Sequence, residues 1–178
     1  IGCTRLLDQS GARQLGGWYS GSEFALGPLA QLPGKMLEIG RTCVSPTARS
    51  GAVIAVLWSG LASFIHLQRV DYLFGCASMP LGEQDLQAAA IMNRLRRQSM
   101  SPEHLRVRPK QPLAQSQVAE DVLDAPLPPL LKAYVRLGAK ACGEPCRDPD
   151  FQVADVLMLL DVNELDPSYA RHFFNRSI

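Results

Sequence analysis

Runs of apolar residues of strand length recur along this chain, and they predict the strands of a sheet. One run opens the chain at 1–7, a second spans 36–44, a third spans 70–78 and a fourth spans 153–162. Apolar runs of this length between turn residues are typical of strands that are covered on one or both faces. We therefore expect four principal strands, with the third and fourth the most deeply buried.

Helical patterns fill much of the space between these strands. The segment 51–66 is apolar nearly all round, so we expect a helix buried between the sheet and another layer. Segment 86–98 carries an apolar stripe at helical spacing, and a further short helix closes the chain at 165–174. Prolines at 128 and 129 favour a helix start, and Gly138 is a plausible C-terminal cap for that helix. A strand, a helix and a strand in succession over 36–78 predict one parallel unit in a mixed α/β sheet.

The segment 8–33 lacks sustained periodicity and is rich in Gly, Ser and Pro, so it reads as a long loop. Trp18, Tyr19 and Phe24 lie within it. These aromatic residues predict either a lid over a site or simple anchors that hold the loop against the core.

Composition limits the classes of protein that fit. With 178 residues, 47% of them apolar and 20% charged, a single soluble globular domain over 1–178 is expected. We expect this domain to lack N-terminal elements, because the chain opens directly in a strand without an initiator Met. A formal net charge of +1 gives no general attraction to nucleic acid. The apolar run at 52–65 is shorter than the roughly 20 residues that a membrane span needs, so a cytoplasmic protein is expected.

The five cysteines have no spacing typical of a metal site or a disulfide framework. We interpret them as buried reduced thiols, and we expect no metal site. The histidines are scattered, and no Ser/His/Asp arrangement is present.

Two charged residues inside the second strand are the main candidates for chemistry. Glu38 in an apolar strand must be paired, protonated or functional, since burial of an unpaired charge is costly. As a general base it could accept a proton from an attacking amine, and Arg41 could hold a substrate carboxylate or Glu38 itself. A structural ion pair is the alternative, and the sequence alone favours it. Strict alternation would place them on opposite faces, so a joint role predicts a β-bulge near Gly40.

Arg5 and Asp155 also lie inside apolar strands, where isolated charges are uncommon. Either they form ion pairs, or they line a polar cleft together with Glu38 and Arg41.

The connection from the second strand to the following helix could bind a phosphate. Backbone N–H groups at a helix start are unpaired and attract anions, and glycine allows close approach. An ordinary loop with a solvated arginine is the alternative. The candidate residues are Val44, Arg49, Ser50, Gly51 and Ala52.

A basic region lies further along the chain. It can be an ordinary solvated surface or a docking site for an acidic protein, and nucleic acid is disfavoured because aromatic residues are not interleaved with it. Its arginines are Arg94, Arg96, Arg97, Arg106 and Arg108.

Several blocks in order resemble one family. LEIGRTCVSPTARSGAVIAVLWSGLASF, VDYLFGCASM, LLKAYVRLGAKACGEP and FQVADVLMLLD resemble the ornithine-acyl carrier protein N-acyltransferases, whose relatives include hemolysin-like acyltransferases. Arg5-Leu6 and the Glu38-x-x-Arg41 strand also resemble acyl-homoserine-lactone synthases and N-acyl amino acid synthases. All of these are similar to the GNAT fold.

The resemblance implies a three-layer GNAT-like fold, with a mixed, mostly antiparallel sheet, helices on both faces, splayed central strands and a bulge near Gly40. It implies transfer of a long-chain acyl group from acyl carrier protein to the α-amine of an amino acid, ornithine being favoured. Glu38 and Arg41 would be catalytic, and the acceptor would contact Arg5, Asp155, Cys76 and Ser78.

The resemblance also implies the donor and its surroundings. The phosphopantetheine phosphate would meet the loop and helix start at 44 and 49–52, and acyl carrier protein would dock on the basic region. The Arg49-Ser50-Gly51-Ala52 loop is shorter than the usual GNAT pattern, which favours a carrier-protein donor over acyl-CoA. Peripheral contact with the inner membrane is also expected.

Two alternatives remain open. The acceptor could be glycine, an aromatic amino acid or the precursor of a signalling lactone. A non-catalytic module that binds acyl carrier protein would instead have a sheet cleft plugged by side chains.

Overall fold

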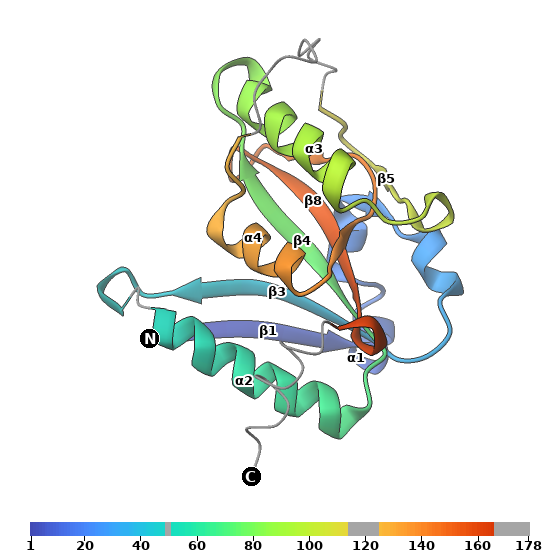
Figure 1. Ribbon diagram of the computed structural model, residues 1–178. Helices are drawn as coiled ribbons and strands as arrows, with labels where there is room; N and C mark the ends of the chain where they lie inside the picture. Colours follow the sequence, from blue (N-terminus) through green and yellow to red (C-terminus); the bar gives the residue numbers. More distant parts are fainter. Residues whose placement is uncertain (49–50, 114–124, 166–178) are drawn as a thin grey trace.

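A six-stranded mixed sheet forms the centre of the protein (Figure 1). The computed structural model describes residues 1–48, 51–113 and 125–165. The strands follow the order β1-β3-β4-β8-β6, and β7 also pairs with β8. They span Gly2–Asp8 (β1), Met36–Val44 (β3), Tyr72–Pro80 (β4), Lys140–Ala141 (β6), Cys146–Asp148 (β7) and Val153–Asp161 (β8).

Strand directions agree with the predicted mixed sheet. β3 and β4 are parallel and are joined through helix α2 (Gly51–Gln68), whereas every other neighbouring pair is antiparallel. The longest pairing joins β4 to β8 over nine residue pairs, from Tyr72 with Asp161 to Pro80 with Val153. This confirms the GNAT-like sheet and its parallel unit.

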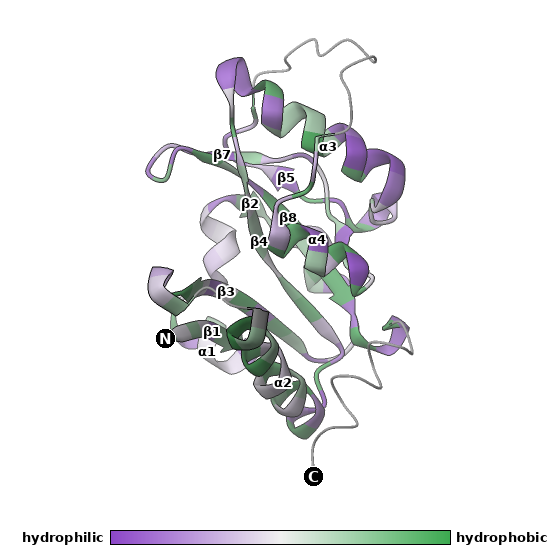
Figure 2. Cartoon of the chain, turned by 60° about the vertical axis from the view of Figure 1, so that its left-hand side comes forward, coloured by the Kyte–Doolittle hydropathy of each residue, from purple (hydrophilic) through white to green (hydrophobic). Residues whose placement is uncertain are grey.

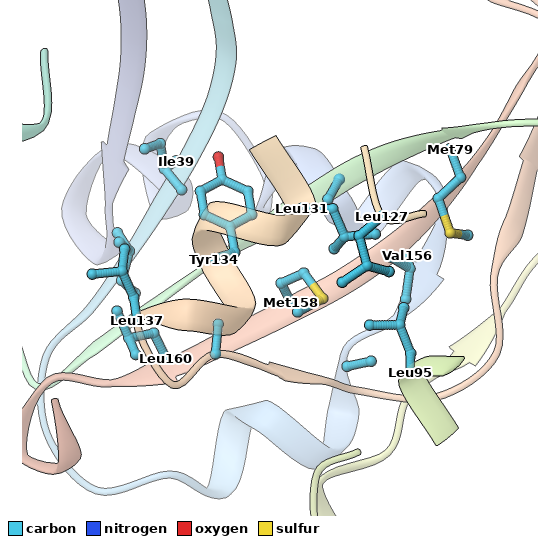
Figure 3. Close-up of a cluster of buried hydrophobic side chains, with 14 of the residues drawn as sticks. Ile39, Met79, Leu95, Leu127, Leu131, Tyr134, Leu137, Val156, Met158 and Leu160 are labelled. Atoms are coloured by element: carbon cyan, nitrogen blue, oxygen red, sulfur yellow. The ribbon is translucent and has the colours of Figure 1, made fainter. Parts of the chain in front are cut away.

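The three long helices contribute to one hydrophobic core on one face of the sheet. α2, α3 (Leu86–Gln98) and α4 (Pro129–Arg136) supply buried side chains to the same cluster as alternate residues of β4 and β8. Figure 3 shows Leu131 and Tyr134 of α4 among Val156, Met158 and Leu160 of β8. α4 ends as predicted, since Gly138 has a φ of +99° and its N–H bonds to the carbonyl of Val135.

The opposite face is covered by the segment that was predicted to be a long loop. This segment is folded into short pieces, and a second core cluster lies under it that includes Phe24, Leu29, Phe74 and Leu157. Its pieces are α1 (Gln9–Gln14), the 3₁₀ helices η1 (Tyr19–Ser22) and η2 (Gly27–Gln31), and β2 (Phe24–Ala25), which pairs with β5 (Arg108–Pro109).

Four further 3₁₀ helices are described at the ends of longer elements. They are η3 (Pro46–Ala48), η4 (Glu83–Asp85), η5 (Glu103–Leu105) and η6 (Val162–Glu164).

Two expectations about burial were wrong. α2 is apolar along most of its length (Figure 2), yet the described residues cover only one side of it. Leu61 and Ile65 are buried, whereas Val56 and Leu67 are 72% and 76% exposed. The helix is therefore not enclosed between two layers of the described structure.

The cysteines also differ from the expectation of buried thiols. Cys142 and Cys146 are buried, but Cys3 and Cys43 are exposed on the neighbouring strands β1 and β3, and all five are free thiols. Strand pairing places Cys3 opposite Cys43, and their sulfur atoms lie 3.2 Å apart.

Two other findings concern the predicted helices. The predicted helix at 165–174 lies almost wholly outside the described residues. Among the helices of the described residues, none has both the length and the apolar character to cross a membrane.

Candidate active site

A β-bulge interrupts β3 next to Gly40, as predicted. Cys3 pairs with Cys43 and Arg5 pairs with Gly40, so two residues of β3 stand opposite one residue of β1. Arg41 lies in the bulge and has a φ of +52°, a conformation that is uncommon for a residue with a side chain. The additional residue shifts the alternation of the strand by one position beyond Gly40.

The shift brings Glu38 and Arg41 to the same side of the sheet. Both side chains contact Tyr19: its backbone N–H donates to Glu38 Oε2 (2.8 Å), and Arg41 Nη2 donates to its hydroxyl (2.7 Å). Regular alternation would have directed Arg41 to the opposite face. The bulge is therefore what places the two candidate residues in one site.

β3 and β4 part immediately after Glu38. Their pairing extends only from Met36 with Tyr72 to Glu38 with Phe74, although both strands continue for six residues beyond the last pair. Figure 1 shows β1 and β3 diverging from β4 and β8. At the point of divergence, a Cβ atom on Gly75 would lie only 2.1 Å from the carbonyl oxygen of Ile39. The predicted splayed strands are therefore present.

A cleft of about 370 Å³ lies at this splay. Its lining combines residues of β3, β4 and β8 with residues of η1 and α4 and of the turn after β7. The polar lining includes Tyr19, Ser20, Glu23, Glu38, Arg41, Thr42, Cys76, Ser78, Asp148 and Asp155, and the apolar lining includes Ile39, Ala77, Leu130, Leu131, Tyr134, Phe151 and Val153.

Glu38 is 2% exposed and is held by donors of η1. Its carboxylate accepts hydrogen bonds from the backbone N–H of Tyr19, from the backbone N–H of Ser20 (2.6 Å) and from the hydroxyl of Ser20. These donors offset the cost of burying the carboxylate charge. The sequence offered a structural ion pair as one explanation of Glu38, but the donors that hold its carboxylate in the described part of the chain are uncharged.

Arg5 was predicted to form an ion pair or to line the cleft, and in the structure it contacts the aromatic ring of Tyr19. The guanidinium groups of Arg5 and Arg41 lie over the ring of Tyr19, at 4.6 Å and 4.8 Å from its centroid, and Arg41 also lies 5.6 Å from the ring of Phe151. Such contacts orient a cation through the electron-rich face of the ring. Glu38, Arg41 and Asp155 thus line one cleft, and Arg5 lies beside it against Tyr19.

The aromatic residues of the N-terminal segment have two different roles. Trp18 packs edge-on against Phe74 with centroids 5.0 Å apart, and Phe24 is buried. Both anchor the segment to the core, whereas Tyr19 lines the cleft.

Three carboxylates gather at another part of the cleft. Ligand atoms of Glu23, Asp148 and Asp155 all lie within 4.8 Å of one another, and Ser78 donates a hydrogen bond to Asp155 (2.7 Å). Burial, and then the nearby Asp155 carboxylate, raise the pKa of Glu23 to about 7. Burial also raises the pKa of Asp155. Glu23 and Asp148 were not predicted from the sequence, because only the folded η1 and the pairing of β7 with β8 bring them to Asp155.

Cys76 and Ser78, predicted to contact substrate, both line the cleft from β4. The thiol of Cys76 donates to the hydroxyl of Ser20 (3.3 Å). Burial raises the pKa of Cys76 far above its usual range, so this residue is a thiol and not a thiolate nucleophile.

The predicted phosphate loop is described only at its two ends. Val44 is the last residue of β3, and Gly51 and Ala52 begin α2. Arg49 and Ser50 lie outside the described residues. The helix that follows has 18 residues, and the N–H groups in the first turn of any α-helix have no partner within the helix.

The arginines of the basic region are mostly exposed. Arg96 forms a two-point ion pair with Glu144 (2.5 and 3.0 Å). Arg94 is half-buried and donates to Gln98. Arg106 is exposed and donates to the carbonyl oxygen of Ser101 (3.2 Å), and Arg97 and Arg108 are also exposed.

Comparisons with known proteins support the same architecture. The acetyltransferase (GNAT) domain family matches residues 1–59, which contain β1, the bulged β3 and the start of α2. No solved structure matches the chain.

Curated relatives extend over nearly all of the chain. An L-ornithine N(alpha)-acyltransferase of Rhodobacter capsulatus is 32% identical over 100% of this chain and 70% of its own length. Proteins of that name from Rhizobium meliloti and Agrobacterium fabrum are 34% and 33% identical over 97% of this chain, which spans 61% and 62% of their lengths. The chain therefore belongs to the L-ornithine N(alpha)-acyltransferase family, a group of GNAT acyltransferases.

Proposed function

We propose that this protein transfers a long-chain acyl group from acyl carrier protein to the α-amine of L-ornithine, giving lyso-ornithine lipid. The observation that carries the proposal is the cleft at the β3–β4 splay, where Glu38 and Arg41 meet around Tyr19. The names of the relatives supply the acceptor.

In this proposal the thioester lies between β3 and β4, close to Glu38 and Cys76. The amine nitrogen attacks the thioester carbon, an amide C–N bond forms, and the C–S bond breaks. Glu38 accepts a proton from the amine, directly or through one water, and this proton then passes to the leaving thiolate, which departs as a thiol. Backbone N–H groups beside the bulge polarise the carbonyl oxygen as negative charge develops on it.

Arg41 and Arg5 orient the carboxylate of the acceptor or fix the site around Glu38. The Arg41 guanidinium reaches the cleft because the bulge turns it there, and Tyr19 holds it in place. Arginine suits this role because its planar donors match the geometry of a carboxylate.

The acyl chain would lie along the apolar wall of the same cleft. Leu130, Leu131 and Tyr134 of α4, together with Ile39 of β3, provide that wall. Burial of acyl methylene groups there would contribute binding energy of about 0.8 kcal/mol for each group.

For the donor, we propose the phosphopantetheine of acyl carrier protein, with its phosphate at Val44 and 49–52, and acyl-CoA as the less favoured donor. The basic region offers a positively charged surface, which complements an acidic carrier protein. Its exposed arginines are Arg96, Arg97, Arg106 and Arg108. A lipid product also suits a cytoplasmic protein in peripheral contact with the inner membrane.

The two alternative functions predict different results. Another N-acyl amino acid synthase would share this cleft and differ in the acceptor. A non-catalytic module that binds acyl carrier protein predicts a plugged cleft, and the open volume of about 370 Å³ disfavours it.

The proposal is tested by lipid profiling. The full-length protein is expressed in a host that lacks ornithine lipids, and lipid extracts are examined by mass spectrometry. We expect N-acyl-ornithine with the wild-type protein and none with Glu38→Gln. Accumulation of a different N-acyl amino acid would show that another amino acid is the acceptor. The absence of any new lipid would contradict the proposal.

A further inference from the structure

We propose that Glu23, Asp148 and Asp155 form the subsite that binds the side-chain ammonium of the acceptor, and that this subsite selects a diamino acid over a neutral amino acid. The inference rests on the proposed function, and it identifies which residues determine acceptor specificity.

The geometry of the three carboxylates suits an ammonium group. Their oxygen atoms lie within 4.8 Å of one another, so one cation can contact all three. Asp155 is 5% exposed, and Glu23 Oε2 is buried without a hydrogen-bond partner among the described residues. A buried carboxylate oxygen without a donor is costly, and an ammonium group would supply that donor.

Neighbouring basic side chains do not fill this role. Arg147, next to Asp148 in the chain, forms its ion pair with Asp85 on η4. The ammonium of Lys110 donates to the carbonyl oxygen of Gly21 (2.5 Å). The cluster thus keeps a local excess of negative charge, which is consistent with the raised pKa values of Glu23 and Asp155.

The charges along the cleft match the charges of a diamino acid. The charged lining consists of one guanidinium, that of Arg41, and the carboxylates Glu23, Glu38, Asp148 and Asp155. Arg41 and Glu38 belong to β3, whereas Asp148 and Asp155 belong to β7 and β8 on the other side of the splay. An acceptor can therefore place its α-carboxylate near Arg41, its α-amine near Glu38 and its side-chain ammonium at the three acids.

This arrangement accounts for discrimination against neutral side chains. An acceptor without the terminal amine would leave the carboxylates close together, desolvated and unpaired. A site built to pair with a polar group rejects the analogue that lacks it, because its own buried groups lose their partner.

The test compares L-ornithine with L-norvaline, which has the same carbon chain without the terminal amine. Using the full-length protein and acyl carrier protein loaded with a fatty acyl group, kcat/KM is measured for both acceptors. We expect Glu23→Gln to lower the ornithine-to-norvaline ratio of kcat/KM by about tenfold or more, mainly through the KM of ornithine.

Controls separate this role from a structural one. Glu103→Gln removes an exposed carboxylate outside the cleft and should leave the ratio unchanged. Asp155→Asn should lower the ratio as Glu23→Gln does, provided that its melting temperature shows a folded protein. Calorimetric titration with each acceptor in the absence of donor should show that ornithine binds, that norvaline does not, and that ornithine binding depends on Glu23. This measurement does not require acyl transfer to occur.

Three results would overturn the inference. Glu23→Gln could slow both acceptors equally, which would assign Glu23 to proton transfer or to folding. The ratio could be unchanged in both variants. Finally, discrimination could be lost in EDTA and restored by Mg²⁺ or Ca²⁺, which would assign the three carboxylates to a divalent cation. A wild-type protein that binds ornithine through Glu23 yet forms no acyl-ornithine would contradict the proposed function and leave the subsite supported.

Discussion

Two glutamates line the same cleft, and their carboxylates differ in the hydrogen bonds that they accept. Glu38 accepts three hydrogen bonds from Tyr19 and Ser20, at the start of η1. Glu23 follows the end of η1, and its Oε2 is buried without a partner among the described residues. A single 3₁₀ helix thus supplies donors to one carboxylate and places beside Asp155 and Asp148 a second one, whose Oε2 has no partner among the described residues.

The difference separates two kinds of site. A carboxylate surrounded by fixed donors is held in one position, as a group that must meet a reacting amine requires. A carboxylate beside other carboxylates is destabilised until a cation arrives, as a recognition site requires. The four predictions that follow test this distinction, beginning with the largest expected effect.

Glu38→Gln should lower kcat for acyl transfer by about 10²–10⁴-fold, the usual contribution of a general base. The amide NH₂ would also face an N–H donor of η1, so the free energy of unfolding should fall by about 1–3 kcal/mol. Ser20→Ala is the matched control, because it removes one of the three hydrogen bonds and keeps the carboxylate. Turnover of Glu38→Gln as high as that of Ser20→Ala would exclude Glu38 as the base.

Gly75→Ala should disturb the point where β3 and β4 part. Its Cβ would lie 2.1 Å from the Ile39 carbonyl oxygen, so we expect a loss of about 1–3 kcal/mol in the free energy of unfolding, measured by urea denaturation. Gly60→Ala on α2 is the control: its Cβ would meet no atom within 4 Å, and alanine should stabilise the helix by up to about 1 kcal/mol. Equal stability of Gly75→Ala and the wild type would mean that the splay does not depend on this contact.

Arg41→Gly should separate the backbone of the bulge from the function of the guanidinium. Glycine suits the positive φ and should gain about 1 kcal/mol there, which offsets lost contacts with Tyr19. Stability should then be nearly unchanged, whereas the acceptor KM should rise about tenfold for both ornithine and norvaline. An unchanged KM would show that Arg41 does not bind the acceptor. Comparison with Arg41→Lys shows how much of the acceptor binding a positive charge alone restores.

Glu23→Gln should produce the smallest effect, a change in how stability depends on pH. The pKa of Glu23 is raised from 4.5 to about 7 in the folded protein, so the folded state binds its proton more tightly than the unfolded state does. Glu23 therefore lowers stability as the pH rises through this range. The variant should melt a few degrees above the wild type at pH 8 and close to it at pH 5. A pH-independent difference, or none, would show that Glu23 is not destabilised in the empty cleft.

Much of the fold could be predicted from local pattern. The principal strands and helices follow from apolar runs and from breakers such as Gly138, and the strand at 36–44 has the predicted bounds. The bulge was predicted from the requirement that Glu38 and Arg41 act together, supported by the glycine between them. These features depend on residues close together in the sequence.

The missed features depend on distant contacts. Segment 8–33 looked like a loop because its helices and its strand are short, and they are stabilised by packing of Trp18 on Phe74 and of Phe24 in the second core. Glu38 finds its donors in Ser20 and Tyr19, eighteen and nineteen residues away. Asp148 and Glu23 meet across still greater separations. The pattern of apolar and polar residues along the sequence does not predict contacts between residues so far apart.

The most direct test of the central claim is the identity of the product. The full-length protein is supplied with acyl carrier protein loaded with a fatty acyl group and with L-ornithine, and the product is examined by tandem mass spectrometry. If the α-amine lies at Glu38 and the side-chain ammonium lies at the three acids, only the α-nitrogen should be acylated. Acylation of the side-chain nitrogen, or a mixture of both products, would contradict this orientation, and no product would contradict the acyl transfer itself.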